Sequence, residues 1–564
     1  MKTPFGSIGR TYRHINRYRQ LITILIKYGF DDIVDSLNLS HYIEMGKSAI
    51  SRKPPQEIKS IPRAKRIRLI VEELGTTYIK FAQILSTRPD LISQELIEEF
   101  VKLQDRVPPF PSEEAYKIIE YELDGEIDEL FKEISPEPIA SASIAQVYLA
   151  VLPDGEEVAV KVKRPDIERI TEVDIEIMKN LAKIGENHFR GLEIIQPVSI
   201  IEEFARQLDD EMNFHLEAHN IERFAENFQD VENVHTMSVY RSHSSRAVLT
   251  TELIRGTKIS EMDKLEKEGV DKHIIAVTGT NAILKQIFQD GFFHGDPHPG
   301  NLFVTDKKKL CFIDFGMMGN LDRHNQEALA EVLVNIIQKN EEQITRSVLN
   351  VATNPDEIKD LTKLKQEILR FVNTYAYMPL DQMNVGEILK DLLNLFISNG
   401  IKLPPEYYLL IKAIATIEGI GRDLDPNFIF IDYTKPYVER LIKQRYDPRR
   451  LASDMGKTTV EFYQLLRDAP GEIREMLKFI KRGEIKIDLE TKSLLPVIKT
   501  WDRDANRLAY AIVNASVLLS SSLIIMAHMP PQWHNVSIPG IIGLCISGLM
   551  SFRLLIAIFM SNHL

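Results

Sequence analysis

Two polar motifs that interrupt apolar runs constrain the fold of this chain more than any other feature of its sequence. The motif HGDPHPGN (294–301) stands between the apolar segments IFQDGFF and LFV, and the segment CFIDFG (311–316) follows closely. Short apolar runs bounded by turn residues predict buried strands. A hairpin between Asn301 and Asp314 would place both side chains at one edge of a sheet, beside Asp296.

Composition indicates that this hairpin belongs to a folded protein. The length of 564 residues leaves room for about three or four domain-sized units. The 44% hydrophobic and 27% charged content is that of a folded and not of a disordered chain. The net charge of -12 argues against a nucleic-acid partner. Cys311 and Cys545 lie far apart in apolar surroundings, which predicts a reducing compartment and no disulfide framework or zinc site.

The C-terminal region contains two long apolar segments. Residues 508–529 run for 22 positions without a charge, which is enough for a helix to cross a bilayer. Residues 536–560 are apolar except for Arg553, which lies where it can reach the interface. The alternative is a pair of buried core helices. We expect a transmembrane hairpin, because a soluble core rarely leaves so long a charge-free run at a chain end.

The flanking charges predict the orientation of this hairpin. Arg503 and Arg507 precede the first span and the loop carries no Lys or Arg, so both ends are expected on the cytoplasmic side. Small residues recur at helical spacing in the second span, at Gly540, Gly543, Ser547 and Ser551. Such a stripe packs helix on helix and allows a homodimer.

The N-terminal 30 residues hold six Lys or Arg and no acid. Their longest apolar run, LITILI, is too short for a signal peptide or a membrane anchor. We expect a basic amphipathic helix near anionic lipid, with an ordinary solvated helix face as the alternative.

The pattern between these ends predicts an α+β protein. Residues 65–106 show helical periodicity, and two β-rich runs from about 139 are joined by a Pro-Asp-Gly turn, which predicts a hairpin. Residues 198–228 are predicted to form one long helix, and residues 247–256 a strand that ends in a glycine turn. Residues 323–480 alternate helices with short loops.

The polar residues form a recognisable set in chain order. Lys161 ends the alternating strand VAVK, Asp296 and Asn301 follow, and Asp314-Phe315-Gly316 completes the set. Protein kinases use these residue types for the nucleotide phosphates, for a base and for two metal ligands. Oxygen ligands suit Mg²⁺. A pseudokinase scaffold is disfavoured because every one of these side chains is present.

Several segments differ from an ordinary protein kinase. HGDPHPGN replaces His-Arg-Asp, no G-x-G-x-x-G loop precedes Lys161, and ELGTTYIKFAQILSTRPDLI (73–92) has no counterpart. These segments resemble the UbiB family of atypical kinase-like proteins, which is required for ubiquinone biosynthesis. The resemblance runs from about residue 60 to the C-terminal hairpin. It implies an α+β, protein kinase-like, two-lobed fold, with an N-terminal helical extension over the cleft and a C-terminal two-helix transmembrane hairpin.

The expected domains follow from this resemblance and from the apolar segments. They are a helical extension (1–130), a kinase-like N-lobe (131–256), a kinase-like C-lobe (257–450), a helical linker (451–507) and the transmembrane hairpin (508–560).

The resemblance also implies residue roles. Lys161 would be the nucleotide lysine, Asp296 the catalytic aspartate, and Asn301 and Asp314 the Mg²⁺ ligands. Glu252 and Leu253 would form the hinge that meets adenine. The family's alanine-rich phosphate loop would be Ala140, Ser141, Ala142, Ser143, Ile144, Ala145 and Gln146.

Lys80 and Gln83 match the family's Lys-x-Gly-Gln motif, in which Ala82 here replaces the glycine. Asn213 replaces the acid of a Glu-x-Asp motif that begins at Glu211. Glu211 and Glu217 are candidates for ion pairs with Lys80 and Lys161, and the sequence leaves the pairing open.

The expected function is therefore that of a membrane-anchored ATPase, or of a kinase of small molecules or lipids, that supports isoprenoid quinone synthesis. A true protein kinase is the alternative. Alanine Cβ atoms hinder the close approach of a phosphate loop that glycine allows, and a covered cleft excludes a polypeptide substrate. The expected cofactors are ATP and Mg²⁺. The expected partners are membrane lipid, quinone precursors and other quinone-biosynthesis proteins, at the cell (inner) membrane with the kinase-like domain on the cytoplasmic side.

Overall fold

The computed structural model describes residues 5–36, 60–103, 108–188, 196–337, 341–355, 360–375, 383–445, 495–527, 529–533 and 536–559, with residues 58, 358 and 378. The chain separates into two compact units, Met1–Ser453 and Asp454–Leu564, and each is described by itself. Most of the linker expected at 451–507 lies outside the described residues.

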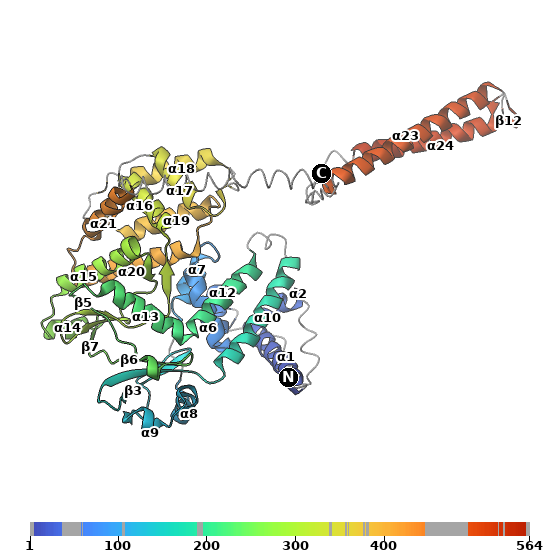
Figure 1. The fold of residues 1–564 in the computed structure, drawn as a ribbon. Coiled ribbons are helices and arrows are strands. Elements are labelled where there is room, and N and C mark those ends of the chain that lie inside the picture. Colours follow the sequence, from blue (N-terminus) through green and yellow to red (C-terminus); the bar gives the residue numbers. More distant parts are fainter. Residues whose placement is uncertain are drawn as a thin grey trace, which may run out of the picture. The chain divides into compact units, whose positions relative to one another are not determined.

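A five-stranded antiparallel sheet is the centre of the N-lobe (Figure 1). Its order is β1-β3-β4-β6, with β2 paired to β3. Its strands are β1 (Glu133–Ile134), β2 (Ala140–Ser141), β3 (Ala145–Val151), β4 (Glu157–Lys163) and β6 (Val248–Glu252). The turn between β3 and β4 closes as the Leu152 N–H donates to Glu156 O at 2.8 Å, with Gly155 at a φ of 94°. The hairpin predicted from Pro-Asp-Gly is confirmed.

The two faces of this sheet are covered by different helices. Val158, Val160 and Val162 are fully buried against α8 (Ser112–Leu123), which is followed by the short α9 (Ile127–Leu130). Successive side chains of a strand point to opposite faces. Lys161 therefore points to the other face, which packs against α13 (Phe214–Phe228).

The long helix predicted at 198–228 is wrong, because two helices occupy that segment. They are α12 (Pro197–Glu211) and α13, and Asn213 caps the second by accepting from His215 N–H at 3.2 Å. Asparagine is among the preferred N-cap residues because its side-chain oxygen satisfies an unpaired helix N–H. The Phe214 N–H donates to Arg246 O at 3.2 Å and so ties the start of α13 to the chain just before β6.

The N-terminal extension consists of α1 (Phe5–Lys27), α2 (Asp31–Ser36), α5 (Arg63–Leu74), α6 (Thr76–Ser86) and α7 (Gln94–Phe100). It packs beside α10 (Ile167–His188) and α12 (Figure 1). Arg17 of α1 donates to both carboxylate oxygens of Asp174 on α10, at 2.6 and 2.9 Å, and to Leu74 O at 2.7 Å. Leu21 and Ile22 are buried in the same cluster. Protein thus covers the apolar face of α1 that was expected to lie near lipid.

The C-lobe contains small sheets and a larger group of helices. The strands are β5 (Val234–His235), β7 (Gly256–Lys258), β8 (Phe292–His294), β9 (Leu302–Thr305), β10 (Leu310–Phe312) and β11 (Met318–Asn320). The helices are α14 (Met262–Lys267), α15 (Lys272–Lys285) with a π-helical turn at Gln286–Asp290, α16 (Arg323–Ile337), α17 (Glu341–Val351), α18 (Leu361–Tyr375), α19 (Val385–Ser398), α20 (Pro405–Leu424) and α21 (Phe430–Arg445). A 3-10 turn (Arg241–His243) precedes β6.

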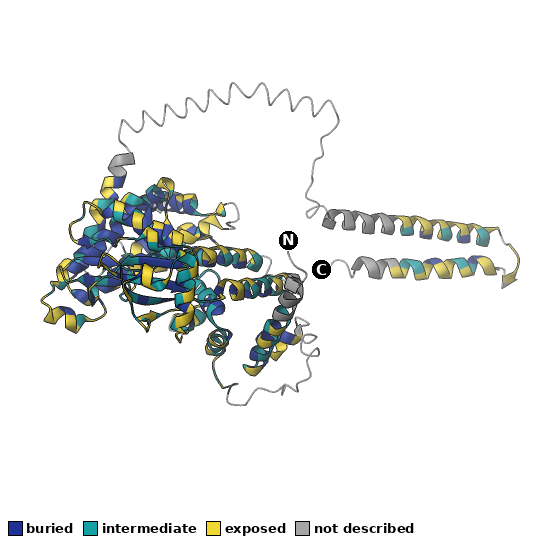
Figure 2. Ribbon diagram, turned by 60° about the horizontal axis from the view of Figure 1, so that its bottom comes forward, coloured by how far each residue is buried: buried dark blue, intermediate teal, exposed yellow. Residues whose placement is uncertain are grey.

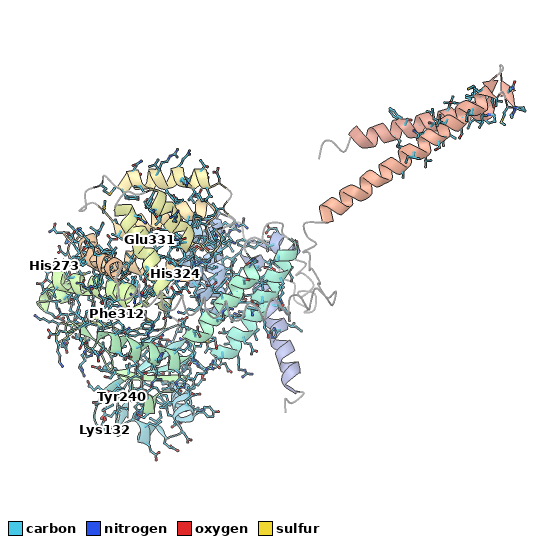
Figure 3. All side chains as sticks on the ribbon, turned by 45° about the horizontal axis from the view of Figure 1, so that its top comes forward. Lys132, Tyr240, His273, Phe312, His324 and Glu331 are labelled. Carbon is cyan, nitrogen blue, oxygen red and sulfur yellow. The ribbon has the colours of Figure 1, made fainter. Side chains whose placement is uncertain are left out.

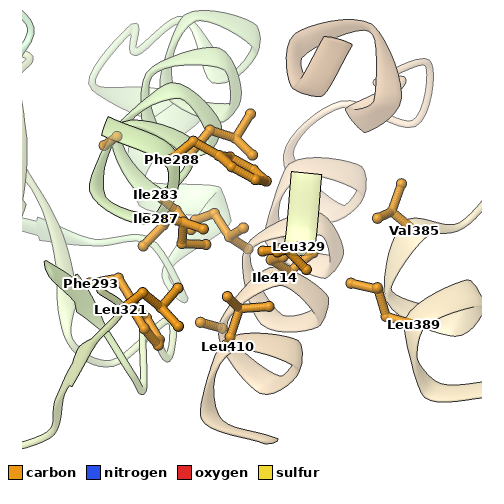
Figure 4. Packing of buried hydrophobic residues seen from close by; sticks show 14 of the residues in the cluster. Ile283, Ile287, Phe288, Phe293, Leu321, Leu329, Val385, Leu389, Leu410 and Ile414 are labelled. Carbon is orange, nitrogen blue, oxygen red and sulfur yellow. The ribbon is translucent and has the colours of Figure 1, made fainter. Parts of the chain in front are cut away.

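Helix α20 runs through the core of the C-lobe. Its Leu410 and Ile414 are buried beside Leu329 of α16 and Leu389 of α19, and Figure 4 shows these side chains together. At the C-terminal end of α20, Asp425 contacts His273 at the start of α15 at 2.6 Å, and Figure 3 shows His273 at one edge of the unit. Burial of α20 on several sides makes it a rigid support for the side chains on its remaining face.

The C-terminal unit is a helical hairpin of α23 (Leu495–Met526) and α24 (Ile538–Phe559), joined through β12 (Gln532–Trp533) and β13 (Val536–Ser537). A Cβ atom on Gly543 would lie 2.0 Å from Ser521 Oγ. Asn514 donates to Ser551 Oγ at 2.7 Å and accepts from the Ser547 hydroxyl at 2.8 Å. The small-residue stripe of α24 therefore packs against α23 of the same chain.

The outer surface of the hairpin is apolar. Leu523 is 64% exposed and Leu549 is 71% exposed, and Figure 2 shows exposed positions along both helices. Among the described residues, the segment Ala509–Met526 is long and apolar enough to span a bilayer, while the apolar part of α24, Ile538–Arg553, is shorter.

Candidate functional site

Lys161 forms the central ion pair of the site. Its Nζ lies 2.8 Å from both carboxylate oxygens of Glu217 on α13. The Lys161 side chain is 27% exposed and that of Glu217 is 6% exposed. The alternation of β4 and the helical start fixed by Asn213 bring the two residues together. The structure thus settles which glutamate Lys161 contacts.

Lys80 takes the other glutamate. Its Nζ lies 2.5 Å from Glu211 Oε1 at the end of α12, and the two side chains are 13% and 21% exposed. Lys80 and Gln83 lie on α6, where the Ala82 side chain is buried among apolar neighbours. The methyl group that replaces the family's glycine is therefore accommodated in the core of the extension.

The segment that begins at Asp314 is held by the chain around it. Asp314 Oδ1 accepts from the Gly316 N–H at 3.0 Å, and Phe315 O accepts from the Asn220 amide of α13 at 3.0 Å. The Ile313 N–H donates to Asn301 O at 3.1 Å, as the β9–β10 hairpin requires. The predicted hairpin is confirmed, and it brings Asn301 beside the chain that leads into Asp314.

The loop between β8 and β9 carries Asp296 and Asn301. His294 is 1% exposed, and its Nδ1 accepts from the Asp296 N–H at 3.1 Å. The Asn301 amide nitrogen donates to Asp296 O at 3.4 Å. His298 Nδ1 accepts from the Gly300 N–H at 3.1 Å, so this histidine shapes the turn. The Asp296 carboxylate is 33% exposed, and Lys412 Nζ of α20 lies 3.0 Å from its Oδ1.

The alanine-rich loop is held by an arginine that the sequence motifs did not indicate. Arg164 donates to Ala142 O and to Ser141 Oγ, each at 2.9 Å. Ser143 is 2% exposed. Gln146 is fully buried, and its amide donates to Phe110 O and accepts from Tyr148. The side chain of Gln146 therefore serves the interior of the N-lobe.

The hinge candidates Glu252 and Leu253 follow directly on β6. The Leu253 N–H donates to Glu157 O at 3.2 Å, so the sheet uses this donor. The Glu252 carboxylate contacts His235 Nε2 at 2.9 Å. This contact holds the Glu252 side chain against the protein.

The charges of the site depend on one another. Burial opposes the charge of Lys161, but the Glu217 and Asp314 carboxylates outweigh it and raise the pKa of Lys161. Burial raises the pKa of Glu217, and Lys161 offsets only part of that effect. Burial also opposes the charge of Asp314, but Lys161 and the Gly316 N–H lower its pKa. Asp314 is therefore held as a carboxylate, which is the form that binds a cation.

The donor set fits Mg²⁺ that is shared with a nucleotide. Asn301 uses its amide nitrogen within the loop, which leaves its oxygen as the ligand atom, and Asp314 keeps Oδ2 beside the oxygen held by Gly316. Among the residues that the structure describes, no group of three or more His, Cys, Asp or Glu side chains could hold a metal by itself. Mg²⁺ commonly takes one or two protein ligands and completes its shell with phosphate and water.

Sequence reasoning missed Arg164, Asn220 and Lys412. Each acts through a contact between elements that are distant in sequence, and none belongs to a motif with fixed spacing.

Comparison with known proteins agrees with this arrangement. Residues 102–348 match the ABC1 atypical kinase-like domain, residues 368–429 the UbiB helical domain, and residues 492–560 the ABC1/UbiB kinase-like C-terminal domain. The kinase-like fold expected from the motifs is therefore supported for the region that holds the site.

Relatives align along nearly the whole chain. An uncharacterized protein from the hydrogenase 1 5' region of Clostridium pasteurianum is 33% identical over 98% of this chain and 100% of its own length. A probable protein kinase UbiB of Xanthomonas campestris pv. campestris (strain B100) is 30% identical over 93% of this chain and 96% of its own.

A solved structure, Rv3197 of Mycobacterium tuberculosis with erythromycin, is 22% identical with a TM-score of 0.42 and covers 62% of this chain and 91% of that one. This likeness is too distant to add to the argument. The full-length relatives and the three matched domains are sufficient: the chain belongs to the UbiB family of atypical kinase-like proteins.

Proposed function

We propose that the chain binds ATP and Mg²⁺ in the cleft and uses them as an atypical kinase or ATPase. It would hydrolyse ATP or transfer its terminal phosphoryl group to a small molecule or lipid. The observation that carries this proposal is the convergence of Lys161, paired with Glu217 at 2.8 Å, with Asp314, Asn301 and the Asp296 loop.

Each of these side chains has a task in phosphoryl transfer. Lys161 would neutralise charge on the nucleotide phosphates, and Glu217 keeps its ammonium group in position. Asp296 would orient the attacking hydroxyl or water and accept its proton. Asn301 and Asp314 would hold Mg²⁺, which supplies charge stabilisation on the phosphates when it is bound.

We further propose that the substrate belongs to isoprenoid quinone synthesis and is met at the membrane. Relatives that share the whole chain length are named for UbiB, and the hairpin exposes large apolar side chains on its outer surface. Quinone precursors with polyprenyl tails stay in the bilayer, so an enzyme that acts on them has to be held there. We infer that the kinase-like unit lies on the cytoplasmic side, where ATP is found.

A true protein kinase is the second candidate, and the relatives' name, probable protein kinase, favours it. The contact between Lys80 of the extension and Glu211 favours the small-molecule alternative. It holds α6 in the space that a polypeptide substrate would need to occupy. Phosphate release without a protein acceptor, compared with phosphate transfer to a generic protein, would separate the two.

Replacement of Asp314 by Asn tests nucleotide and metal binding. We expect the Asp314→Asn variant to lose the Mg²⁺-dependent part of its stabilisation by ATP, because a neutral amide is a poor ligand for a hard cation. A thermal-shift titration with ATP, with and without Mg²⁺, measures this. Asp423→Asn changes an exposed carboxylate on α20 and is the matched control. Equal stabilisation of the wild type and the Asp314→Asn variant by MgATP would refute the proposal.

Removal of the chain beyond residue 505 tests the membrane part. Since Lys161, Asn301 and Asp314 lie in the other compact unit, the truncated protein should still bind nucleotide. We expect it to be recovered in the soluble fraction and to fail to restore quinone synthesis in a deficient strain. Full complementation by the soluble form at an equal expression level would show that the hairpin is dispensable for function.

A further inference from the structure

Helix α20 brings a lysine to the catalytic loop from a distant part of the chain. Lys412 Nζ lies 3.0 Å from Asp296 Oδ1, and the two side chains are 35% and 33% exposed. Both groups are therefore within reach of a molecule that enters the cleft. Residues 368–429 match the UbiB helical domain, so this lysine comes from a segment outside the matched ABC1 kinase-like domain.

The backbone around Lys412 is fixed by packing on both sides. Leu410, Ala413 and Ile414 are each no more than 3% exposed in the core of the C-lobe. On the loop side, a Cβ atom on Gly295 would lie 2.5 Å from Leu409 Cδ2. Helix α20 therefore packs directly against Gly295, the residue before Asp296. This contact fixes the loop and the helix relative to each other.

Two other lysines of the site, Lys161 and Lys80, are paired with glutamates that have no catalytic role in the proposed reaction. Lys161 is held by Glu217 and Lys80 by Glu211. Lys412 is different because its partner is the acid that would have to orient the attacking group. If Asp296 orients the attacking group, an ammonium group beside it would lie close to the phosphate on which negative charge develops, and fixed charges in such places contribute strongly to catalysis.

We propose that Lys412 is a catalytic residue that contacts Asp296 in the free protein and the terminal phosphate of bound ATP during transfer. This inference rests on the proposed function. The oxygen of water or of an alcohol bonds to the terminal phosphorus while the bond from phosphorus to the bridging oxygen breaks. The electron pair of that bond stays on the ADP, the proton of the attacking group passes to the Asp296 carboxylate, and Lys412 balances charge on the transferred oxygens.

Lys412→Met and Lys412→Arg, made in the full-length protein, test this role by steady-state release of phosphate from MgATP. We expect Lys412→Met to lower kcat by about 100-fold, the usual cost of losing one donor to the transition state. The KM for ATP and the thermal midpoint should change little, since Lys161 and the metal ligands remain. Lys412→Arg should recover part of the rate, because arginine keeps the charge. Lys390→Met, at an exposed lysine of α19, is the matched control.

The outcomes separate this inference from the function on which it rests. If the wild type turns over ATP and Lys412→Met has the same kcat, the inference is wrong and the proposed function stands. If Lys412→Met lowers kcat, ATP affinity and the thermal midpoint together and Lys412→Arg recovers nothing, Lys412 is structural and the inference is also wrong. A wild type that does not bind MgATP would overturn both.

Discussion

The cleft and the C-terminal hairpin satisfy their polar groups in opposite ways. In the cleft, buried carboxylates are matched by ammonium groups, as Glu217 is by Lys161. In the hairpin, the Asn514 amide is matched by the hydroxyl groups of Ser547 and Ser551 without any charge. A charge leaves water at a much higher cost than a neutral hydrogen-bonding group does.

The charged groups of the cleft are therefore suited to binding and reaction, whereas the neutral groups of the hairpin are suited only to packing. The cleft keeps charges that a hydrophobic core would avoid, and perturbed charges of this kind are typical of sites that bind and react. At the contact between α23 and α24, the hairpin keeps small and neutral groups such as Gly543, Ser521 and Ser547, which suit close helix packing. A mutation in the cleft should therefore act through charge, and a mutation in the hairpin through volume.

The largest effect is expected for Glu217→Gln. The substitution keeps the shape of the buried side chain but leaves Lys161 without the carboxylate that balances its charge, so the free energy of unfolding should fall by about 3 kcal/mol. ATP turnover should fall as well, because the lysine is no longer held. Chemical denaturation and phosphate release measure the two effects.

Glu222→Gln is the matched control on the same helix. Glu222 pairs with Arg241, but both side chains are 43% exposed, and surface pairs of this kind contribute about 0–1 kcal/mol. If Glu217→Gln and Glu222→Gln lowered the free energy of unfolding equally, burial would not make the Lys161–Glu217 pair more stabilising than the surface pair.

An intermediate effect is expected for Gly543→Leu in the hairpin. The larger side chain would meet Ser521 and force α24 away from α23, at a cost of about 1–3 kcal/mol. Limited proteolysis of the full-length protein in detergent should cut the hairpin faster, while ATP binding stays unchanged. Gly548→Leu is the control, because a Cβ atom at Gly548 has nothing within 4 Å. Identical digestion of both variants would contradict the packing described here.

The smallest effect is expected for Lys80→Ala. The loss of this ammonium leaves Glu211 without its partner near Asp314, and the added negative charge should weaken ATP binding by a few-fold. The fold should remain intact, since the carboxylate left behind is 21% exposed at Glu211, whereas Glu217 is 6% exposed. Lys65→Ala, at an exposed position of α5, is the control in a nucleotide-binding titration. Equal ATP affinity in both variants would mean that the Lys80 pair only holds the extension in place.

The sequence predicted the parts of the site that lie close together along the chain. The β9–β10 hairpin was predicted because Asn301 and Asp314 flank two short apolar runs, and Lys161 because an alternating strand precedes it. Strand periodicity and turn residues are local properties, so a single segment reveals them.

The rest depended on contacts between distant segments. In the sequence, Asn213 was interpreted only as a replacement for the acid of a Glu-x-Asp motif, whereas its side chain caps α13 and thereby directs Glu217 toward Lys161. The pairing of Lys80 with Glu211, and the approach of Lys412 to Asp296, are set by how helices pack. A charged residue that belongs to no motif does not reveal its partner, because the sequence contains many residues of opposite charge with which it could pair.

The contact of Arg17 with Asp174 bears on how the protein is made. The two residues are separated by 157 positions, and the Asp174 side chain is fully buried once they meet. Ribosomes add about 5–20 residues per second, so α1 leaves the ribosome roughly 10–30 s before its partner is synthesised. During that interval α1, with Leu21 and Ile22, can pack against α2 and α5 but lacks the surface of α10. Helix α1 therefore completes its native contacts only after α10 has been synthesised, with Asp174 made 157 residues later than Arg17.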